Sequence, residues 1–432
     1  MNPENTRSPS GQELFERLGS GGAEMPRFQP RITQRRRVGK VWRFVFQVST
    51  VAGIVVLALL LLTILDKSFG FVALEDRVKV ESLVPEGAAL ETLPNEALVA
   101  ILQENTSGGL FRRLERERPL EERSHANLLA LIEENVIKPR VVATWPLYDS
   151  LFRRREILSE AAAEYPQARV VFRSWISPRF IASPQAPDPY LAGVRSAIFG
   201  SLYTILITIL AAFPLGVGAA VYLEEYAADT WLNRVIQTNI NNLAGVPSII
   251  YGMLGLSVFV RAMANLTSGA AFGLADPGAA SGRTILSAGL TLALLVLPLL
   301  IINAQEAIRA VPNSLRQASY ALGATRWQTI WHHVLPNAIP GILTGAILSI
   351  SRAIGETAPL VVVGASTFIP FDPSSIFSKF TSLPIQIYQW TARPQDEFRN
   401  LAAAAILVLL CLLLGLNTIS VLMRNRFSRR QL

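Results

Sequence analysis

Residues 312–336 read PNSLRQASYALGATRWQTIWHHVLP, and they lie between two apolar runs, 284–305 and 337–364. Each run is long enough to cross a bilayer as a helix, which takes roughly 20 apolar residues. The quoted stretch differs from its neighbours because it is amphipathic and carries polar side chains along its length. It is therefore predicted to face water between two membrane-spanning helices.

The quoted stretch has the pattern of two short helices joined by a glycine. Ser314 and Gln317 have the S-x-x-Q spacing of a capping box, which predicts the start of the first helix. Glycine readily adopts the left-handed conformation that ends helices, so the first helix is expected to stop at Gly323. Thr325 is placed to cap the second helix.

The second helix is expected to present one apolar face, because four apolar residues recur at helical spacing: Trp327, Ile330, Trp331 and Val334. His332 and His333 should point away from that face. The pattern alone fits either a rigid docking element for a partner or an ordinary interfacial loop.

Composition indicates a membrane protein. Half of the 432 residues are hydrophobic and the mean hydropathy is +0.35. The formal net charge is +8, but many arginines lie at the chain ends beside apolar runs, as the positive-inside rule predicts, so no nucleic-acid partner is expected. The single cysteine, Cys411, excludes a disulfide within the chain, and three histidines are too few to argue for a metal site.

The chain is predicted to be an all-α polytopic membrane protein with six transmembrane helices. Residues 1–40 are interpreted as a disordered basic cytoplasmic tail, and 41–65 as the first helix. The other five helices are expected within a permease domain at 191–423, at about 196–223, 243–260, 284–303, 338–363 and 400–422. Residues 424–432 form a second basic tail. Six crossings place both ends in the cytoplasm.

Residues 66–190 have a mixed-charge composition and are predicted to form a small α/β domain outside the cytoplasm, inserted between the first two helices. About 125 residues suffice for a modest core. Periodicity predicts helices at 95–104 and 125–133 and strands at 140–145 and 169–176. The proline-rich stretch 178–189 is predicted to be a stiff linker back to the membrane.

Arg352 and Glu356 place two charges in the apolar run of the predicted fifth helix. A charge at the centre of a membrane helix costs about 2.5–3.5 kcal/mol on insertion scales, so such residues usually face a bundle interior or an aqueous path. Residues four apart share a helix face. Arg352 can offer a planar fork of donors to an oxyanion, and Glu356 can balance it. The alternative is a buried pair that only locks the bundle.

No catalytic residue is expected in this chain. It contains no G-x-x-x-x-G-K-[ST] loop, which is the loop that binds the phosphates of ATP in many ATPases. If ATP drives the protein, ATP and magnesium must be bound by separate partner subunits.

The 312–336 stretch resembles the cytoplasmic coupling loop of ABC-importer permeases. That loop has the pattern E-A-A, three residues, Gly, nine residues, Ile, one residue, Leu-Pro. Four residues match it in register: Ala318, Gly323, Leu335 and Pro336. Three residues depart from it: Gln317, Ser319 and His333. Gln317 keeps a polar side chain but lacks the charge of the glutamate in the family.

Three further segments resemble the PstA-type permeases of phosphate-specific ABC importers: YLEEY at 222–226, LAGVPSIIYG at 243–252 and RAIGETAPL at 352–360. Ala358-Pro359 favours this type over the sister permease of the same importer. The resemblance covers about 40–65 and 190–425, and it implies the type I ABC-importer permease fold. The domain at 66–190 is longer than the common form of the family, and its role stays open between docking a partner and capping the assembly.

The resemblance implies a subunit that imports inorganic phosphate across the bacterial inner membrane. Its implied partners are a homologous second permease, two ATPase subunits and a periplasmic phosphate-binding protein. The coupling loop, 304–336, would receive the push of the ATPases, and phosphate would pass Arg352 and Glu356. The implied coupling residues are Leu315, Gln317, Ala318, Leu322, Gly323, Trp327, Leu335 and Pro336.

Other functions stay open at this point. A permease for another oxyanion, such as sulfate or molybdate, or the sister phosphate permease would share the coupling loop. A membrane receptor would explain the 66–190 domain but requires a cytoplasmic signalling domain, whereas the predicted cytoplasmic loops are short. A passive anion channel would explain Arg352 but gives no reason for the 312–336 stretch.

Overall fold

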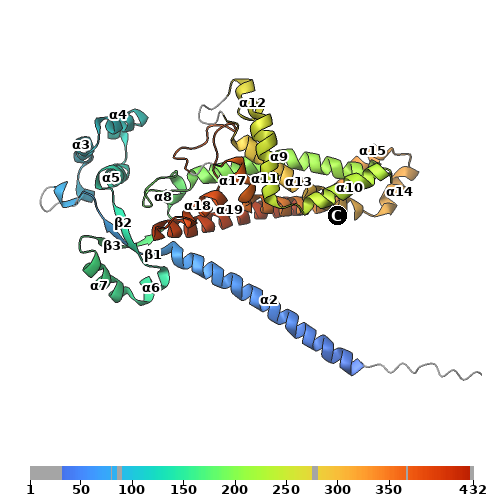
Figure 1. Ribbon diagram of the computed structural model, residues 1–432, viewed down its shortest axis with the longest axis horizontal. Coiled ribbons are helices and arrows are strands. Elements are labelled where there is room, and N and C mark those ends of the chain that lie inside the picture. Colours follow the sequence, from blue (N-terminus) through green and yellow to red (C-terminus); the bar gives the residue numbers. More distant parts are fainter. Residues whose placement is uncertain (1–31, 79, 85–89, 275–280, 366–367, 429–432) are drawn as a thin grey trace, which may run out of the picture. The chain divides into compact units, whose positions relative to one another are not determined.

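Helices dominate the structure, a computed structural model that describes residues 32–428 apart from 79, 85–89, 275–280 and 366–367 (Figure 1). Contacts divide the chain into two units between Leu61 and Leu62. The first contains most of the helix α2 (Ile32–Ser68). Most of the predicted N-terminal tail, 1–31, lies outside the described residues, as does the end of the C-terminal tail, 429–432. Residues 32–40 of the tail are helical rather than disordered, because α2 begins at Ile32.

Five helical stretches are long and apolar enough to cross a membrane: Arg36–Ser68, Arg195–Tyr226, Ile285–Arg309, Arg326–Gly355 and Asp396–Arg426. A bent pair, Trp231–Ala244 with Ser248–Ala262, adds a sixth crossing if it counts as one span. The described chain is therefore a multi-pass helical membrane protein with five or six spans by length and composition.

The bent pair corrects the prediction of one helix at 243–260. Helix α10 (Trp231–Ala244) ends inside that range. After it, α11 (Ser248–Gly255) continues as the π-helix η6 (Leu256–Ala262), and this second segment is bent by 106° from α10. Pro247 causes the break, since the residue before a proline is biased away from helical conformation. The hydroxyl of Tyr251 donates to the carbonyl of Leu243 at 2.7 Å and satisfies the end of α10.

The predicted helix at 338–363 is also broken. Helix α16 (Leu335–Gly355) stops at Glu356, whose ψ of 118° is extended, and α17 (Ala358–Val363) follows. Pro359 explains this break, because in a continuous helix its ring would clash with the carbonyl of Gly355 and leave that carbonyl without a donor.

The central helix of the bundle is α13 (Ile285–Arg309). It packs against α9 (Arg195–Val221) and α16, and 67% of the residues in its most apolar stretch are buried. α9 continues as the π-helix η5 (Tyr222–Tyr226), and α19 (Asp396–Ser428) packs on α16. Shorter elements complete this part: α12 (Ala264–Thr267), the 3-10 helix η7 (Ala270–Phe272) and α18 (Leu383–Thr391).

The part of the chain that follows α2 and precedes α9 forms a three-stranded antiparallel sheet in the order β2-β1-β3. The structure has strands at both predicted places, β2 (Arg140–Thr144) and β3 (Arg169–Ser174). β1 (Phe69–Glu75) was not predicted, because it directly follows the apolar run of α2 and shares its hydropathy.

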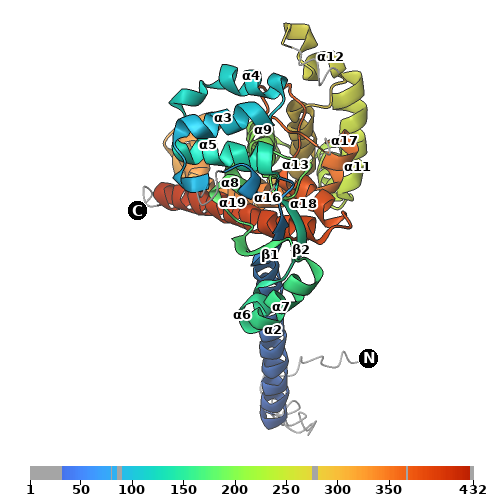
Figure 2. The ribbon, with the colours of Figure 1, turned by 90° about the vertical axis from the view of Figure 1, so that its left-hand side faces the viewer.

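Helices surround this sheet, including two at predicted places, α3 (Asn95–Asn105) and α5 (His125–Ile132). The others are α4 (Gly108–Glu117), the π-helix η4 (Glu133–Ile137), α6 (Leu147–Phe152), α7 (Arg154–Glu164) and α8 (Pro178–Ala182), with 3-10 turns at Val80–Ser82, Leu90–Thr92 and Leu120–Glu122. α8 occupies part of the stretch predicted as a linker. Figures 1 and 2 place α6 and α7 on the other side of the sheet from α3–α5.

The sheet shares one hydrophobic core with the ends of the membrane helices. Val72, Val141 and Trp175 from the sheet region are buried in the same cluster as Trp390 and Leu401. A buried side-chain amide pair adds to it, since Gln185 Nε2 donates to Gln386 Oε1 at 2.6 Å. The domain after α2 is thus fixed to the bundle by packing, whereas α3–α5 have a separate core.

Glu133 joins the α3–α5 cluster to the sheet region. It accepts a hydrogen bond from the hydroxyl of Tyr190 and forms ion pairs with Arg169 at 3.6 Å and Arg179 at 3.9 Å. Burial, together with the bond to Glu133, raises the pKa of Tyr190 to about 12. Tyr190 therefore stays protonated at neutral pH and remains a donor.

Candidate functional site

The stretch between α13 and α16 forms two short helices joined at a sharp turn. Here "the elbow" denotes residues 313–334: α14 (Asn313–Ala321), the turn at Gly323, α15 (Arg326–Thr329) and the π-helix η9 (Ile330–Val334), which leads directly into α16. Gly323 has a φ of +85°, so the predicted left-handed glycine is confirmed.

One of the two predicted caps exists. Gln328 N donates to Thr325 Oγ1 at 3.3 Å while Thr325 N donates to Gln328 Oε1 at 2.9 Å, a reciprocal capping box that confirms the predicted helix start. The predicted capping box of Ser314 and Gln317 is absent, and that prediction was wrong. Pro312 occupies the N-cap position, so Ser314 falls inside the first turn of α14.

Buried contacts hold the two helices of the elbow together. The hydroxyls of Ser319 and Thr329 are hydrogen-bonded at 2.8 Å and are both buried. Ile330 and Val334 are buried as well, and Val334 packs in the core of α13 and α16. The elbow is therefore fixed to its own chain along its inner side.

Large apolar side chains on the outer side of the elbow are exposed and are not buried in a core of the chain. Leu322 is 89% exposed, and Trp327 and Trp331 are exposed and stack with ring centroids 5.3 Å apart. The predicted single apolar face is thus divided: Ile330 and Val334 point inward and the tryptophans outward. The π-helix explains the division, because its i→i+5 hydrogen bonds offset residues that α-helical spacing would align.

The other residues predicted to couple the chain to an ATPase differ in how exposed they are. Gln317 and Ala318 are exposed on α14, whereas Leu315 is half-buried and packs on the core of α13 and α16. Leu335 and Pro336 are half-buried at the start of α16. Leu322 and Trp327 are thus the most exposed of the large apolar residues in the predicted set.

A buried ion pair connects the elbow to the end of α9. Arg316 of α14 contacts Glu225 of η5 through Nη2 at 2.7 Å and Nε at 3.1 Å, and the side chains are only 15% and 7% exposed. The same guanidinium donates to the carbonyls of Ile308 and Val311 at 3.0 and 2.8 Å. Arg316 therefore joins three elements through charge-assisted hydrogen bonds, which are roughly twice as strong as neutral ones.

The neighbouring carboxylate makes a second connection to the end of α13. Arg309 Nη2 lies 2.6 Å from Glu224 Oε1, and Arg309 Nη1 lies 3.0 Å from Glu306 Oε1. Arg309 is 59% exposed, so this pair is solvated. Together the two carboxylates of η5 hold both α13 and the elbow.

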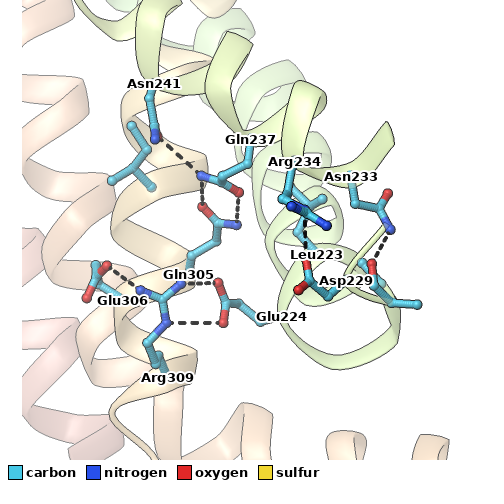
Figure 3. Close-up of a pocket in the computed structure, with 13 residues that line it drawn as sticks. Leu223, Glu224, Asp229, Asn233, Arg234, Gln237, Asn241, Gln305, Glu306 and Arg309 are labelled. Carbon is cyan, nitrogen blue, oxygen red and sulfur yellow. Dashed lines mark hydrogen bonds and ion pairs between the residues drawn. The ribbon is translucent and has the colours of Figure 1, made fainter. Parts of the chain in front are cut away.

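A polar pocket of about 450 Å³ lies beside these pairs, lined by η5, α10 and α13 (Figure 3). At its wall the amides of Gln237 and Gln305 face each other and exchange two hydrogen bonds of 2.7 and 3.1 Å. Asn241 extends this polar row along α10, where it accepts from Gln237 at 3.2 Å. Polar contacts of this kind link membrane helices to one another.

Arg352 and Glu356 lie where α16 ends. Arg352 Nε is 3.2 Å from Glu356 Oε1, so the structure brings the two predicted residues together. Arg352 is 44% exposed and Glu356 18%. The break between α16 and α17 lies close to the segment that follows the break between α10 and α11. A Cβ on Gly252 of α11 would be only 2.7 Å from Pro359 Cα. Irregular backbone inside a membrane bundle is tolerated where it is buried in protein or lines an aqueous cavity, and it marks many transport sites.

Residues 32–428, with their gaps, contain no cluster of three or more His, Cys, Asp or Glu suited to a metal ion. What the arrangement offers is a rigid elbow with exposed apolar side chains at one end, and a partly exposed guanidinium at a helix break.

Sequence reasoning missed the residues that hold the elbow in place: Glu224, Glu225, Arg309 and Arg316. Two adjacent carboxylates directly after an apolar span were one available signal, because carboxylates at such a place need partners if they become buried. The sequence does not say which of the many arginines supplies them.

Comparisons with known proteins agree with this geometry. Residues 212–432 match the family described as binding-protein-dependent transport system inner membrane component. The phosphate transport system permease protein PstA of Mycobacterium leprae is 37% identical over 246 residues, which are 56% of this chain and 74% of that protein. The probable ABC transporter permease protein YqgI of Bacillus subtilis is 34% identical over 257 residues, covering 56% and 82%. The phosphate transport system permease protein PstC of Xylella fastidiosa is 33% identical over 249 residues, covering 55% and 76%.

Proposed function

The chain belongs to the family of binding-protein-dependent transport system inner membrane components and is a permease subunit of an ABC importer, and on this premise we propose that it imports inorganic phosphate. In this proposal the protein is not an enzyme. Two separate ATPase subunits hydrolyse ATP, a homologous second permease completes the pathway, and a periplasmic phosphate-binding protein delivers the anion. The chain lies in the inner membrane with both ends in the cytoplasm.

The observation that carries the proposal is the two-sided elbow. Its inner side is fixed by the Arg316–Glu225 pair and by buried Val334, while Leu322 and Trp327 project outward with no core of their own. Exposed apolar side chains on a rigid support are typical of a docking site. ATPase subunits that close on these residues push the elbow as one body, and Arg316 passes the movement to α13 and to the end of α9.

Arg352 supports phosphate as the cargo. Its guanidinium is partly exposed at the break between α16 and α17, and a planar fork of donors suits a tetrahedral oxyanion. Glu356 accepts from the guanidinium at 3.2 Å and can release it when an anion arrives. The similarity to proteins named as phosphate permeases also supports this cargo. Competition between phosphate and sulfate for uptake tests the choice of oxyanion.

The elbow part of the proposal is tested by replacing Gly323 with proline. Proline fixes φ near −65°, whereas Gly323 has a φ of +85° and donates its N–H to the carbonyl of Tyr320 at 2.9 Å. We expect Gly323→Pro to insert normally but to abolish transport-coupled ATP hydrolysis in vesicles that contain the whole importer.

Gly273→Pro is the matched control. Gly273 also has a positive φ, of +67°, open space for a side chain and an N–H that donates to the carbonyl of Ala270, but it lies at the end of η7. It should carry the same backbone strain without loss of coupling. Unchanged coupling in Gly323→Pro, or an equal loss in Gly273→Pro, would count against the proposal.

A further inference from the structure

A short helix with an unusual exposed face lies at the point where the apolar run of α2 ends. Residues 147–155 read LYDSLFRRR and comprise α6 and the start of α7. Asp66 is the first charged residue after the uncharged run 44–65, and its Oδ1 accepts a hydrogen bond of 2.7 Å from Tyr148 N. Because 44–65 is long enough to cross the hydrocarbon core, this bond places the start of α6 at the boundary between lipid and water.

The orientation of α6 is fixed by a polar residue that points inward. Ser150 is buried, and its Oγ accepts from Phe71 N of β1 at 2.8 Å and donates to Pro146 O at 2.8 Å. With the serine against the sheet, the apolar side chains of α6 must turn outward. A helix that rests on a soluble core does the reverse and buries its apolar face.

Three large apolar side chains occupy the outward face at i, i+3 and i+4: Tyr148, Leu151 and Phe152 are 64%, 64% and 74% exposed. The rings of Tyr148 and Phe152 lie 4.9 Å apart, so the face is continuous. Such contiguous exposed apolar surface marks a contact with a partner or a membrane.

Three consecutive arginines follow directly, and all are exposed: Arg153, Arg154 and Arg155. The guanidinium of Arg154 lies over the ring of Phe71 at 5.8 Å, whereas Arg153 is paired with Glu156 at 2.7 Å. Aromatic residues next to arginines are typical of segments at a membrane–water interface, where rings sit among the headgroups and guanidinium groups contact lipid phosphates.

We propose that residues 147–155 form an interfacial anchor that rests on the lipid bilayer. Tyr148, Leu151 and Phe152 enter the boundary between headgroups and acyl chains in the leaflet where α2 leaves the membrane, and the three arginines bind acidic phospholipid headgroups. The lipid surface is the occupant because the Asp66–Tyr148 bond places this face at the headgroup level, and because the positive charge matches acidic lipids. The anchor sets the height of the domain between α2 and α9 above the membrane, and it does not depend on which substrate is carried.

Spin labelling of the full chain in lipid nanodiscs tests the proposal. Cys411 is the only cysteine, so Cys411→Ser provides a background for single labels. A nitroxide at Leu151→Cys should collide with oxygen, which concentrates in lipid, several-fold more than with a water-soluble nickel chelate. A nitroxide at Glu121→Cys, an exposed residue next to Leu120 of the α3–α5 core, should show the opposite preference.

Access of the nickel chelate to Leu151→Cys equal to that of Glu121→Cys would overturn the anchor. Protection from both reagents that appears only when a purified binding protein is added would overturn it too, in favour of a protein contact.

The role of the arginines is tested by lipid composition. With phosphatidylglycerol in the nanodisc, the nickel chelate should reach Leu151→Cys less than in phosphatidylcholine alone. This difference should disappear when Arg153, Arg154 and Arg155 are replaced together by glutamine. A difference that persists in the triple variant would show that the arginines do not bind the acidic headgroups.

Discussion

Two of the arginine–glutamate pairs in the bundle, Arg316–Glu225 and Arg352–Glu356, are built in opposite ways. Arg316 and Glu225 are 91 positions apart and nearly buried. Arg316 donates to the carboxylate through two nitrogens and also donates to two carbonyls. Arg352 and Glu356 are four residues apart, and within the described residues they share one ionic contact at 3.2 Å, with Arg352 44% exposed. A guanidinium whose three nitrogens all donate within the protein supports structure, whereas a half-solvated one remains available to a ligand. This difference supports our proposals that the first pair gives mechanical support and that Arg352 of the second pair contacts the anion.

The largest expected effect comes from removing one member of the buried pair. Glu225→Gln leaves Arg316 buried without its counter-charge, which costs about 3–5 kcal/mol in such sites. Thermal unfolding of the purified chain should reveal this loss. The double variant Glu225→Leu with Arg316→Met should recover part of it, because no charge is then left unpaired. A double variant as unstable as the single one would contradict the proposed role of the pair.

The second effect concerns transport rather than stability. Arg352→Gln removes hydrogen bonds to a charged ligand, each worth about 1.5–3 kcal/mol, so phosphate uptake should fall about tenfold or more. Unfolding should barely change, since the pair is half-solvated. Arg352→Lys, which keeps the charge but not the fork, should retain part of the activity. Normal uptake by Arg352→Gln with normal insertion would remove this residue from the pathway.

A smaller effect should follow from loss of the cap within the elbow. Thr325→Ala removes the acceptor for Gln328 N, and such caps contribute about 1 kcal/mol. Ser314→Ala is the matched control, because Ser314 makes no cap bond in α14. Hydrogen exchange of the elbow amides should increase in Thr325→Ala alone. Equal exchange in both variants would show that the cap does not stabilise the elbow.

The smallest effect is expected for the solvated neighbour of the buried pair. Arg309 is 59% exposed, and exposed ion pairs contribute about 0–1 kcal/mol. The unfolding temperature of Arg309→Gln should therefore be close to that of the unmodified chain, although this variant loses contacts to two carboxylates. A loss as large as that of Glu225→Gln would show that burial is not what separates these pairs.

Local chemistry in the sequence predicted much of the elbow. Gly323 and Thr325 act through their own backbone and immediate neighbours, so their roles are visible without a fold. The strands at 140–144 and 169–174 were predicted for a similar reason, because their β-branched residues are concentrated in short runs. The prediction of a cap at Ser314 was wrong because Pro312 occupies the N-cap position.

Local sequence patterns did not predict the two helix breaks or the Arg316–Glu225 pair. Pro247 and Pro359 lie inside the predicted spans 243–260 and 338–363, so a search for long apolar runs passes over the change in direction. Arg316 and Glu225 meet only because α9, α13 and α14 pack together, and the sequence alone does not specify which arginine reaches η5. Tertiary packing decides both features.

Our proposal requires the outer side of the elbow to touch an ATPase subunit. A photo-crosslinking amino acid in place of Leu322, which is 89% exposed, tests this directly in membranes that contain the whole importer. The same group in place of Leu274, which is 62% exposed near α12, is the control. We predict an adduct with the ATPase subunit from position 322 and none from position 274; no adduct from 322, or equal adducts from both, would contradict the claim.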